Sequence, residues 1–309
     1  MKNQFKYKLI PIYLKSYYIR LIYRNYINIV LGSFFYCNYS GFFANLVGNY
    51  ILNKNKKIVS LDVNEDIKSD FEFLNKHGYV KIKNNPNLIN ITNKIQAKFE
   101  NEICNIDVPK SLRVEITSIN NLNFYSKFSE VGEILINSHL SDILKCYYKS
   151  NYKIINTHIY RILSKSYIEH SDDSLYGSTE KWHTDGSTTD SLKIFVLLNK
   201  TSAENGPMFL INKSDSENIC KLRRSYNNKF INKTIYENKL NVISFEGEIG
   251  DMLIVDTNKC LHKATEPAFN KTRDMLVFYA SCSKTNSFNF MGVTEQFYGF
   301  KRILNSYYE

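Results

Sequence analysis

Four polar residues in the second half of the chain could build a metal site with an anion-binding group beside it. His183 and Asp185 are two positions apart, so on an extended strand both side chains leave the same face. With His262 they would supply two imidazoles and one carboxylate, which can hold one side of an octahedral ion and leave the other side open. Non-haem Fe(II) oxygenases use this ligand set. Arg273, eleven residues after His262, adds a planar fork suited to the carboxylate of a 2-oxoacid.

Short strand-like segments surround these residues after position 150. They are rich in β-branched and aromatic residues, and turn signals such as Asn205-Gly206-Pro207 and Gly250-Asp251 separate them. Many short strands with this punctuation predict a sandwich or a jelly-roll barrel. We expect strands at 153–163, 192–199, 207–211, 239–245, 251–256 and 274–280. If residues 251–262 and 273–281 pair as a hairpin, His262 and Arg273 become near neighbours across it.

Before residue 150 the pattern is helical, with short extended pieces. Apolar residues recur at helical spacing from Ile67 to Leu74, after helix-capping residues at 62–64, and His77-Gly78 predicts the end of that helix. A short strand should follow at 79–82, with further helices at 88–103 and 130–149. The predicted fold class is therefore α+β, a mainly β core with an N-terminal helical region.

Charge divides the chain into two unequal parts. Residues 1–61 contain nine Lys and Arg residues and no acidic residue, whereas 31 basic and 30 acidic residues share the remaining 248 positions. We therefore predict a basic arm at 1–61 and a near-neutral domain at 62–309. Residues 5–27 fit a basic amphipathic helix, and Asn25–Asn53 is free of charge. Three interpretations of the arm stay open: contact with a membrane surface or a partner, helices packed on the core, or a rather polar membrane span.

Composition argues against several classes of protein. The basic arm carries no RNA- or DNA-binding signature, so no nucleic-acid partner is expected. The six cysteines show no CxxC pair and no regular spacing, which argues against zinc ribbons and thioredoxin-type motifs. They indicate reduced thiols, as in a cytoplasmic protein. The N-terminal region lacks the compact apolar block and small-residue cleavage site of a secretory signal.

Several segments of the chain, together with His262 and Arg273, resemble the phytanoyl-CoA dioxygenase family of Fe(II)/2-oxoglutarate oxygenases. The resemblance covers roughly residues 65–282, and its metal and arginine motifs are the specific part. The segments are Phe73-Leu74-Asn75-Lys76-His77-Gly78-Tyr79-Val80, Trp182-His183-Thr184-Asp185-Gly186, Glu204-Asn205-Gly206-Pro207-Met208 and Gly250-Asp251-Met252-Leu253-Ile254-Val255-Asp256.

The resemblance implies a double-stranded β-helix and a site within the domain at 62–309. His183, Asp185 and His262 would bind Fe(II), and Arg273 would hold the distal carboxylate of 2-oxoglutarate, with O2 as the second co-substrate. The expected reaction is hydroxylation of a small molecule with release of succinate and CO2. Related halogenases replace the carboxylate ligand with a small residue, so the presence of Asp185 favours hydroxylation.

The chain departs from the family pattern at two places. A hydroxyl residue often lies two positions after the distal histidine, but that position is Ala264, so Thr265 beside it is the candidate helper for the co-substrate. The family often follows its Asn-Gly-Pro turn with a Pro-Gly-Ser-His-type loop, and this chain has Ile211-Asn212-Lys213-Ser214-Asp215 instead.

Two other classes stay open: a different metal enzyme on a cupin-like barrel, and a non-catalytic barrel that acts as a binding module. The first would not need an arginine at position 273 and would not consume 2-oxoglutarate, and the retention of all four site residues argues against the second. The substrate pocket should come from loops at 105–130, 165–182 and 213–238. The last of these is basic, which fits either an anionic substrate group or a solvated loop. His158, Arg161 and Lys193 are each open to two interpretations, contact with a ligand or an ordinary place in a strand.

Overall fold

The computed structural model describes residues 63–84, 86–104, 113–118, 123–136, 138–164, 180–185, 191–221 and 228–283. The predicted basic arm at 1–61 lies outside the described residues, so its boundary and its role stay predictions. Among the described helices, none has both the length and the apolar character needed to cross a membrane.

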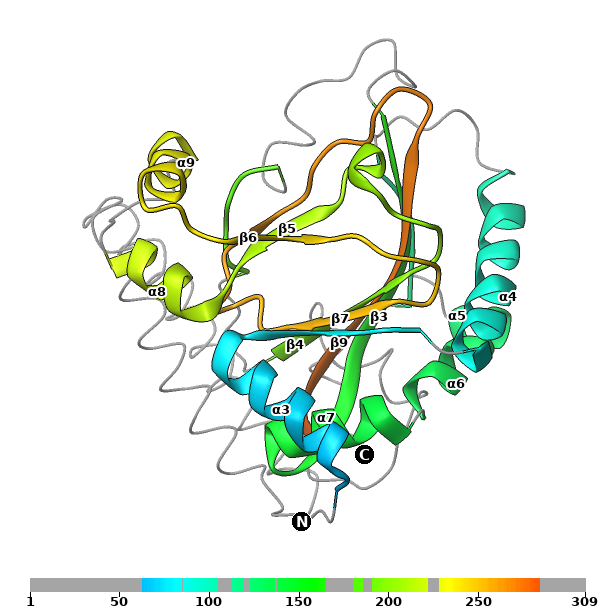
Figure 1. Ribbon diagram of the computed structural model, residues 1–309. Coiled ribbons are helices and arrows are strands. Elements are labelled where there is room, and N and C mark those ends of the chain that lie inside the picture. The colour runs from blue at the N-terminus through cyan, green and yellow to red at the C-terminus, as the bar shows by residue number, and fades with distance from the viewer. Residues whose placement is uncertain are drawn as a thin grey trace, which may run out of the picture.

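The described chain is a mixture of helices and antiparallel strands, as the α+β prediction requires (Figure 1). The helices are α3 (Glu65–His77), α4 (Pro86–Ile103), α5 (Phe124–Lys127), α6 (Glu130–Leu135), α7 (Ser138–Tyr148), the 3-10 helix η3 (Ala203–Asn205), α8 (Lys213–Lys221) and α9 (Asn228–Glu237). The strands are β1 (Tyr79–Ile82), β2 (Arg113–Thr117), β3 (Asn151–Leu163), β4 (Ser191–Leu197), β5 (Met208–Ile211), β6 (Val242–Phe245), β7 (Met252–Val255), β8 (His262–Lys263) and β9 (Thr272–Ser283).

The strands form two antiparallel sheets. The large sheet has six strands in the order β1-β7-β4-β9-β3-β2, and the small sheet has three strands in the order β6-β5-β8. Side chains alternate between the faces of the large sheet. Ile194 and Val196 of β4 pack with the buried residues of α3, α4, α6 and α7. Phe195 and Leu197 point the other way and pack with Leu210 of the small sheet. The large sheet therefore lies between a layer of helices and the small sheet (Figure 1).

Helix α3 and strand β1 follow from their local sequence. The side chain of Asn64 accepts a hydrogen bond from the Ile67 amide at 2.9 Å and caps the start of α3. Gly78 ends the helix with φ of 80°, a conformation that glycine adopts at little cost. Leu74 is fully buried on the inner face of the helix. The predicted helix, its glycine stop and the strand at 79–82 are all confirmed.

The prediction of a loop at 213–238 is wrong, because α8 and α9 occupy most of this segment. Asn212 caps α8 by accepting a hydrogen bond from the Asp215 amide at 2.9 Å. Each helix buries a narrow apolar stripe that includes Ile219 in α8 and Ile231 in α9. The many Lys and Asn residues between these positions hid that stripe in the sequence. The segment 105–130 likewise contains β2, α5 and the start of α6 instead of forming one continuous loop.

Candidate metal centre

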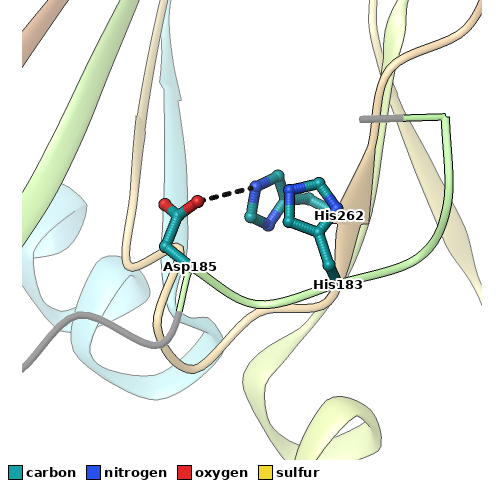
Figure 2. A group of neighbouring side chains, drawn as sticks. All are labelled: His183, Asp185 and His262. Atoms are coloured by element: carbon teal, nitrogen blue, oxygen red, sulfur yellow. Dashed lines mark ion pairs between the residues drawn. The ribbon is translucent and has the colours of Figure 1, made fainter. Parts of the chain in front are cut away.

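His183, Asp185 and His262 converge, and their candidate ligand atoms all lie within 4.8 Å of one another. The His183 amide donates to the His262 carbonyl at 3.1 Å, and the His262 amide donates to the His183 carbonyl at 2.9 Å. The Asp185 amide donates to the Thr257 carbonyl at 3.0 Å, just beyond the end of β7. In Figure 2 the carboxylate of Asp185 faces the two imidazole rings. Backbone pairing therefore brings together ligands that are almost 80 residues apart.

The two histidines present the same ring nitrogen to this site. Nδ1 of His183 lies 2.7 Å from the Lys181 carbonyl oxygen, and Nδ1 of His262 lies 3.1 Å from the Cys260 carbonyl oxygen. A carbonyl oxygen only accepts, so each Nδ1 must carry the proton. Each Nε2 then keeps its lone pair for a metal, and the carbonyl fixes the orientation of the ring. The donor set therefore fits a divalent metal ion.

Trp182 anchors the segment that carries His183 and Asp185. Its side chain is 2% exposed and packs with Ile231 of α9. Its indole Nε1 donates to Oδ1 of Asn232 at 3.0 Å, also from α9. Helix α9, which the sequence did not reveal, thus helps to hold the first two ligands in place.

The charges at the site suit metal binding. Burial alone would raise the pKa of Asp185, but the charges of Lys193 and His262 hold that pKa below its ordinary value. Burial lowers the pKa of His262 to about 4, in spite of the opposing influence of Asp185. At neutral pH, Asp185 is therefore a carboxylate and His262 a neutral imidazole, which are the forms that bind metals.

Residues 251–262 and 273–281 do not pair as a hairpin. Strand β4 lies between β7 and β9 in the large sheet, and His262 belongs to β8 of the small sheet. Arg273 lies in β9, opposite Ile162 of β3. The turn at 264–271 carries the chain from one sheet to the other, so His262 and Arg273 lie in different sheets.

Arg273 is a fully buried guanidinium, 1% exposed, near the start of β9. Its Nη1 donates to the Thr265 carbonyl at 3.4 Å, which ties β9 to the segment just after His262. The Thr265 hydroxyl donates to the Pro207 carbonyl at 2.6 Å. A buried guanidinium requires acceptors around it, and a carboxylate is the acceptor that best matches its planar fork.

The fold is similar to that of EctD from S. alaskensis. The apo structure of EctD aligns with a TM-score of 0.51 and 13% identity over 74% of this chain and 82% of EctD. Its structure with bound Fe gives a TM-score of 0.50 and 12% identity over 74% and 83% of the two chains. Its structure with 2-oxoglutarate and 5-hydroxyectoine gives 0.50 and 12% over 73% and 80%. No family model and no curated protein matches the sequence. At this identity the likeness shows a common fold.

Lys193 joins the site directly, although the sequence left its role open. It lies in β4, and its Nζ forms an ion pair with Oδ2 of Asp185 at 2.7 Å. A lysine inside the apolar run Ser191–Leu197 was the available signal, because a buried strand carries a charge only where that charge is paired. The sequence did not name the partner.

Arg161 lies on the opposite face of the large sheet. Its Nε donates to Oδ1 of Asp274 at 2.8 Å, and its guanidinium also pairs with Glu100 of α4. It therefore links the sheet to the helix layer and does not face the metal site.

His158 lies on the site side of β3. Its register partner Val277 packs on the face that meets the small sheet, and opposed residues share a face. Its Nδ1 lies 3.4 Å from Oε1 of Glu115, and its ring centroid lies 5.1 Å from that of Tyr279.

Proposed function

We propose that this protein is an Fe(II)- and 2-oxoglutarate-dependent oxygenase that hydroxylates a small molecule. The observation that carries the proposal is the convergence of His183, Asp185 and His262, with both Nε2 atoms available as metal ligands. The two packed antiparallel sheets support a double-stranded β-helix, and the motifs around them support a phytanoyl-CoA dioxygenase-like enzyme. A fold similar to that of EctD, which has been crystallised with Fe and with 2-oxoglutarate, is consistent with this proposal.

Each residue has a defined role under this proposal. His183, Asp185 and His262 hold the metal, and Arg273 pairs with the distal carboxylate of 2-oxoglutarate. Thr265 would assist that carboxylate by donating its hydroxyl proton, which in this structure it donates to the Pro207 carbonyl at 2.6 Å. Bound Fe(II), with 2-oxoglutarate and O2, supplies the oxidising chemistry, which yields succinate, CO2 and a hydroxylated product. The residues 1–61 are proposed to contact a membrane surface or a partner.

The proposal is tested by adding Fe(II) and 2-oxoglutarate to the purified protein without oxygen. We expect the visible charge-transfer band of a 2-oxoacid chelated to Fe(II). His183→Ala removes a ligand and should abolish the band, whereas His77→Gln, at the end of α3, should leave it unchanged. Trp182 is the sole tryptophan and precedes His183, so its fluorescence gives a second measure of metal binding.

The arginine is tested in the same assay. Arg273→Ala should raise the dissociation constant for 2-oxoglutarate at least tenfold while changing that for Fe(II) by less than about threefold, since the loss of one bidentate charged pair is worth several kcal/mol. Arg273→Lys keeps the charge without the planar fork, so its dissociation constant for 2-oxoglutarate should lie between those of the parent protein and Arg273→Ala. An unchanged band in both His183→Ala and Arg273→Ala would refute these assignments.

A further inference from the structure

The two oxygens of Asp185 lie in different surroundings. Oδ1 is 3.7 Å from Nε2 of His262 and so faces the candidate metal position (Figure 2). Oδ2 is 2.7 Å from Nζ of Lys193 and faces away from the imidazoles. One oxygen of the carboxylate therefore faces the imidazoles, and the other pairs with an ammonium group.

Lys193 is held firmly in this position. It is the only charged residue of β4, and its side chain is 15% exposed. The strand register places it between Val255 of β7 and Tyr279 of β9. Its Nζ lies 4.8 Å from the centre of the Tyr279 ring, a distance at which the ring stabilises a cation. Taking an ammonium out of water costs several kcal/mol, and the Asp185 carboxylate offsets part of that cost.

We propose that Lys193 is a positioning residue that restricts Asp185 to binding the metal through Oδ1 alone. A carboxylate can bind a metal through one or both oxygens. For Oδ2 to reach the ion as well, it would have to leave the ammonium or draw the ammonium toward a divalent cation, which repels it. Lys193 therefore keeps the second oxygen away from the metal.

This restriction sets the number of coordination positions on the metal that stay open to other ligands. The inference rests on the proposed function. Three protein atoms on an octahedral ion leave three positions, whereas a bidentate Asp185 would leave two. A chelating 2-oxoacid occupies two positions. Lys193 thus preserves one position beyond those that the co-substrate needs.

The test counts the water molecules bound to Mn²⁺, an ion that takes the same oxygen and nitrogen ligands, in the absence of 2-oxoglutarate. Water enriched in ¹⁷O broadens the electron paramagnetic resonance spectrum of Mn²⁺ in proportion to the waters bound, so the measurement needs no catalytic turnover. The parent protein should bind three waters and Lys193→Met two, because the freed Oδ2 replaces one water on an octahedral ion. Lys193→Arg keeps the charge and should retain three.

Lys81→Met is the matched control. Lys81 is also a strand lysine of the large sheet, but its ammonium donates to the Ser244 carbonyl at 2.6 Å, and its loss should leave three waters. Equal counts in the parent protein and Lys193→Met would overturn the inference. A count of two in the parent protein would overturn it without any variant. Failure of Mn²⁺ to bind, or equal binding to His183→Ala, would instead refute the proposed function.

Discussion

The buried ion pair between Arg161 and Asp274 should make a large and measurable contribution to stability. Arg161 grips the carboxylate with two bonds, Nε to Oδ1 at 2.8 Å and Nη2 to Oδ2 at 2.6 Å. Asp274 is fully buried, and the Arg161 side chain is 16% exposed. In Arg161→Met the carboxylate would keep a neutral donor, Nε2 of Gln96 at 2.6 Å, but would lose its cation.

The magnitude follows from leaving a buried charge without its partner. We expect Arg161→Met to lower the free energy of unfolding by about 3–5 kcal/mol, the range for removing one member of a buried pair. Methionine keeps an apolar stem near Phe99, over whose ring the Arg161 guanidinium lies at 6.0 Å, so lost packing contributes little. The double variant Arg161→Met/Asp274→Leu removes both charges and should recover most of the loss. Glu100→Gln alters a side chain that is 41% exposed and should cost about 1 kcal/mol or less.

Urea unfolding followed by Trp182 fluorescence measures these differences, with far-ultraviolet circular dichroism as an independent probe. Metal affinity of the folded variants should stay within about twofold of the parent protein, because Arg161 faces the helices and not the metal site. A loss below about 1 kcal/mol in Arg161→Met, or a double variant as unstable as the single one, would contradict the charge-pair argument. A large fall in 2-oxoglutarate affinity without loss of stability would instead indicate that Arg161 contacts the ligand.

Two further predictions concern pH and a turn. The metal-free protein should be most stable between about pH 6.5 and 9. Below that range His262 takes up a proton in the unfolded chain but not in the folded protein, because burial lowers its pKa to about 4, so stability falls. Above that range Cys260 loses a proton in the unfolded chain but not in the folded protein, because burial raises its pKa to about 12, so stability falls again. Melting temperature against pH checks both limbs, and Cys260→Ala should weaken the alkaline one, to which the raised pKa values of Cys146 and Tyr79 also contribute. Gly206→Ala should lower the free energy of unfolding by at least about 2 kcal/mol in urea titrations, because φ is +67° and a Cβ would lie 2.5 Å from the Thr265 carbonyl oxygen; a neutral effect would contradict this.

The sequence predicted those helices and strands that are specified by nearby residues, such as capping residues and apolar runs. Asn64 and Gly78 mark the ends of α3, and the long apolar run at 153–163 corresponds to β3. Strand β8 could not be found in this way, because it has two residues and exists only where they pair with β5. Strand β2 is a short edge strand in which charged and apolar residues alternate, and helix α9 is recognisable only by a few buried isoleucine positions.

In the candidate site, too, local sequence revealed some features, and others depend on how distant segments pack. His183, Asp185 and His262 could be recognised in the sequence as candidate ligands, because two imidazoles and a carboxylate in this pattern suit a metal ion. The path of the chain from His262 to Arg273 could not, since sequence distance suggested a hairpin where the chain instead crosses between sheets. Lys193 was visible as a charge in an apolar strand, but only its ion pair in the folded structure shows that it meets Asp185.

The backbone around the candidate ligands holds their side chains together without a metal. The segment 256–262 leaves β7, accepts the Asp185 amide at Thr257 and ends at His262, which exchanges two backbone hydrogen bonds with His183. One short connection between the two sheets therefore fixes all three candidate ligands. Because each ligand is held by the protein itself, a metal would not have to order a loose loop, and the entropic cost of assembling the site is met during folding. A change that loosens this connection should therefore weaken metal binding even when every ligand is retained.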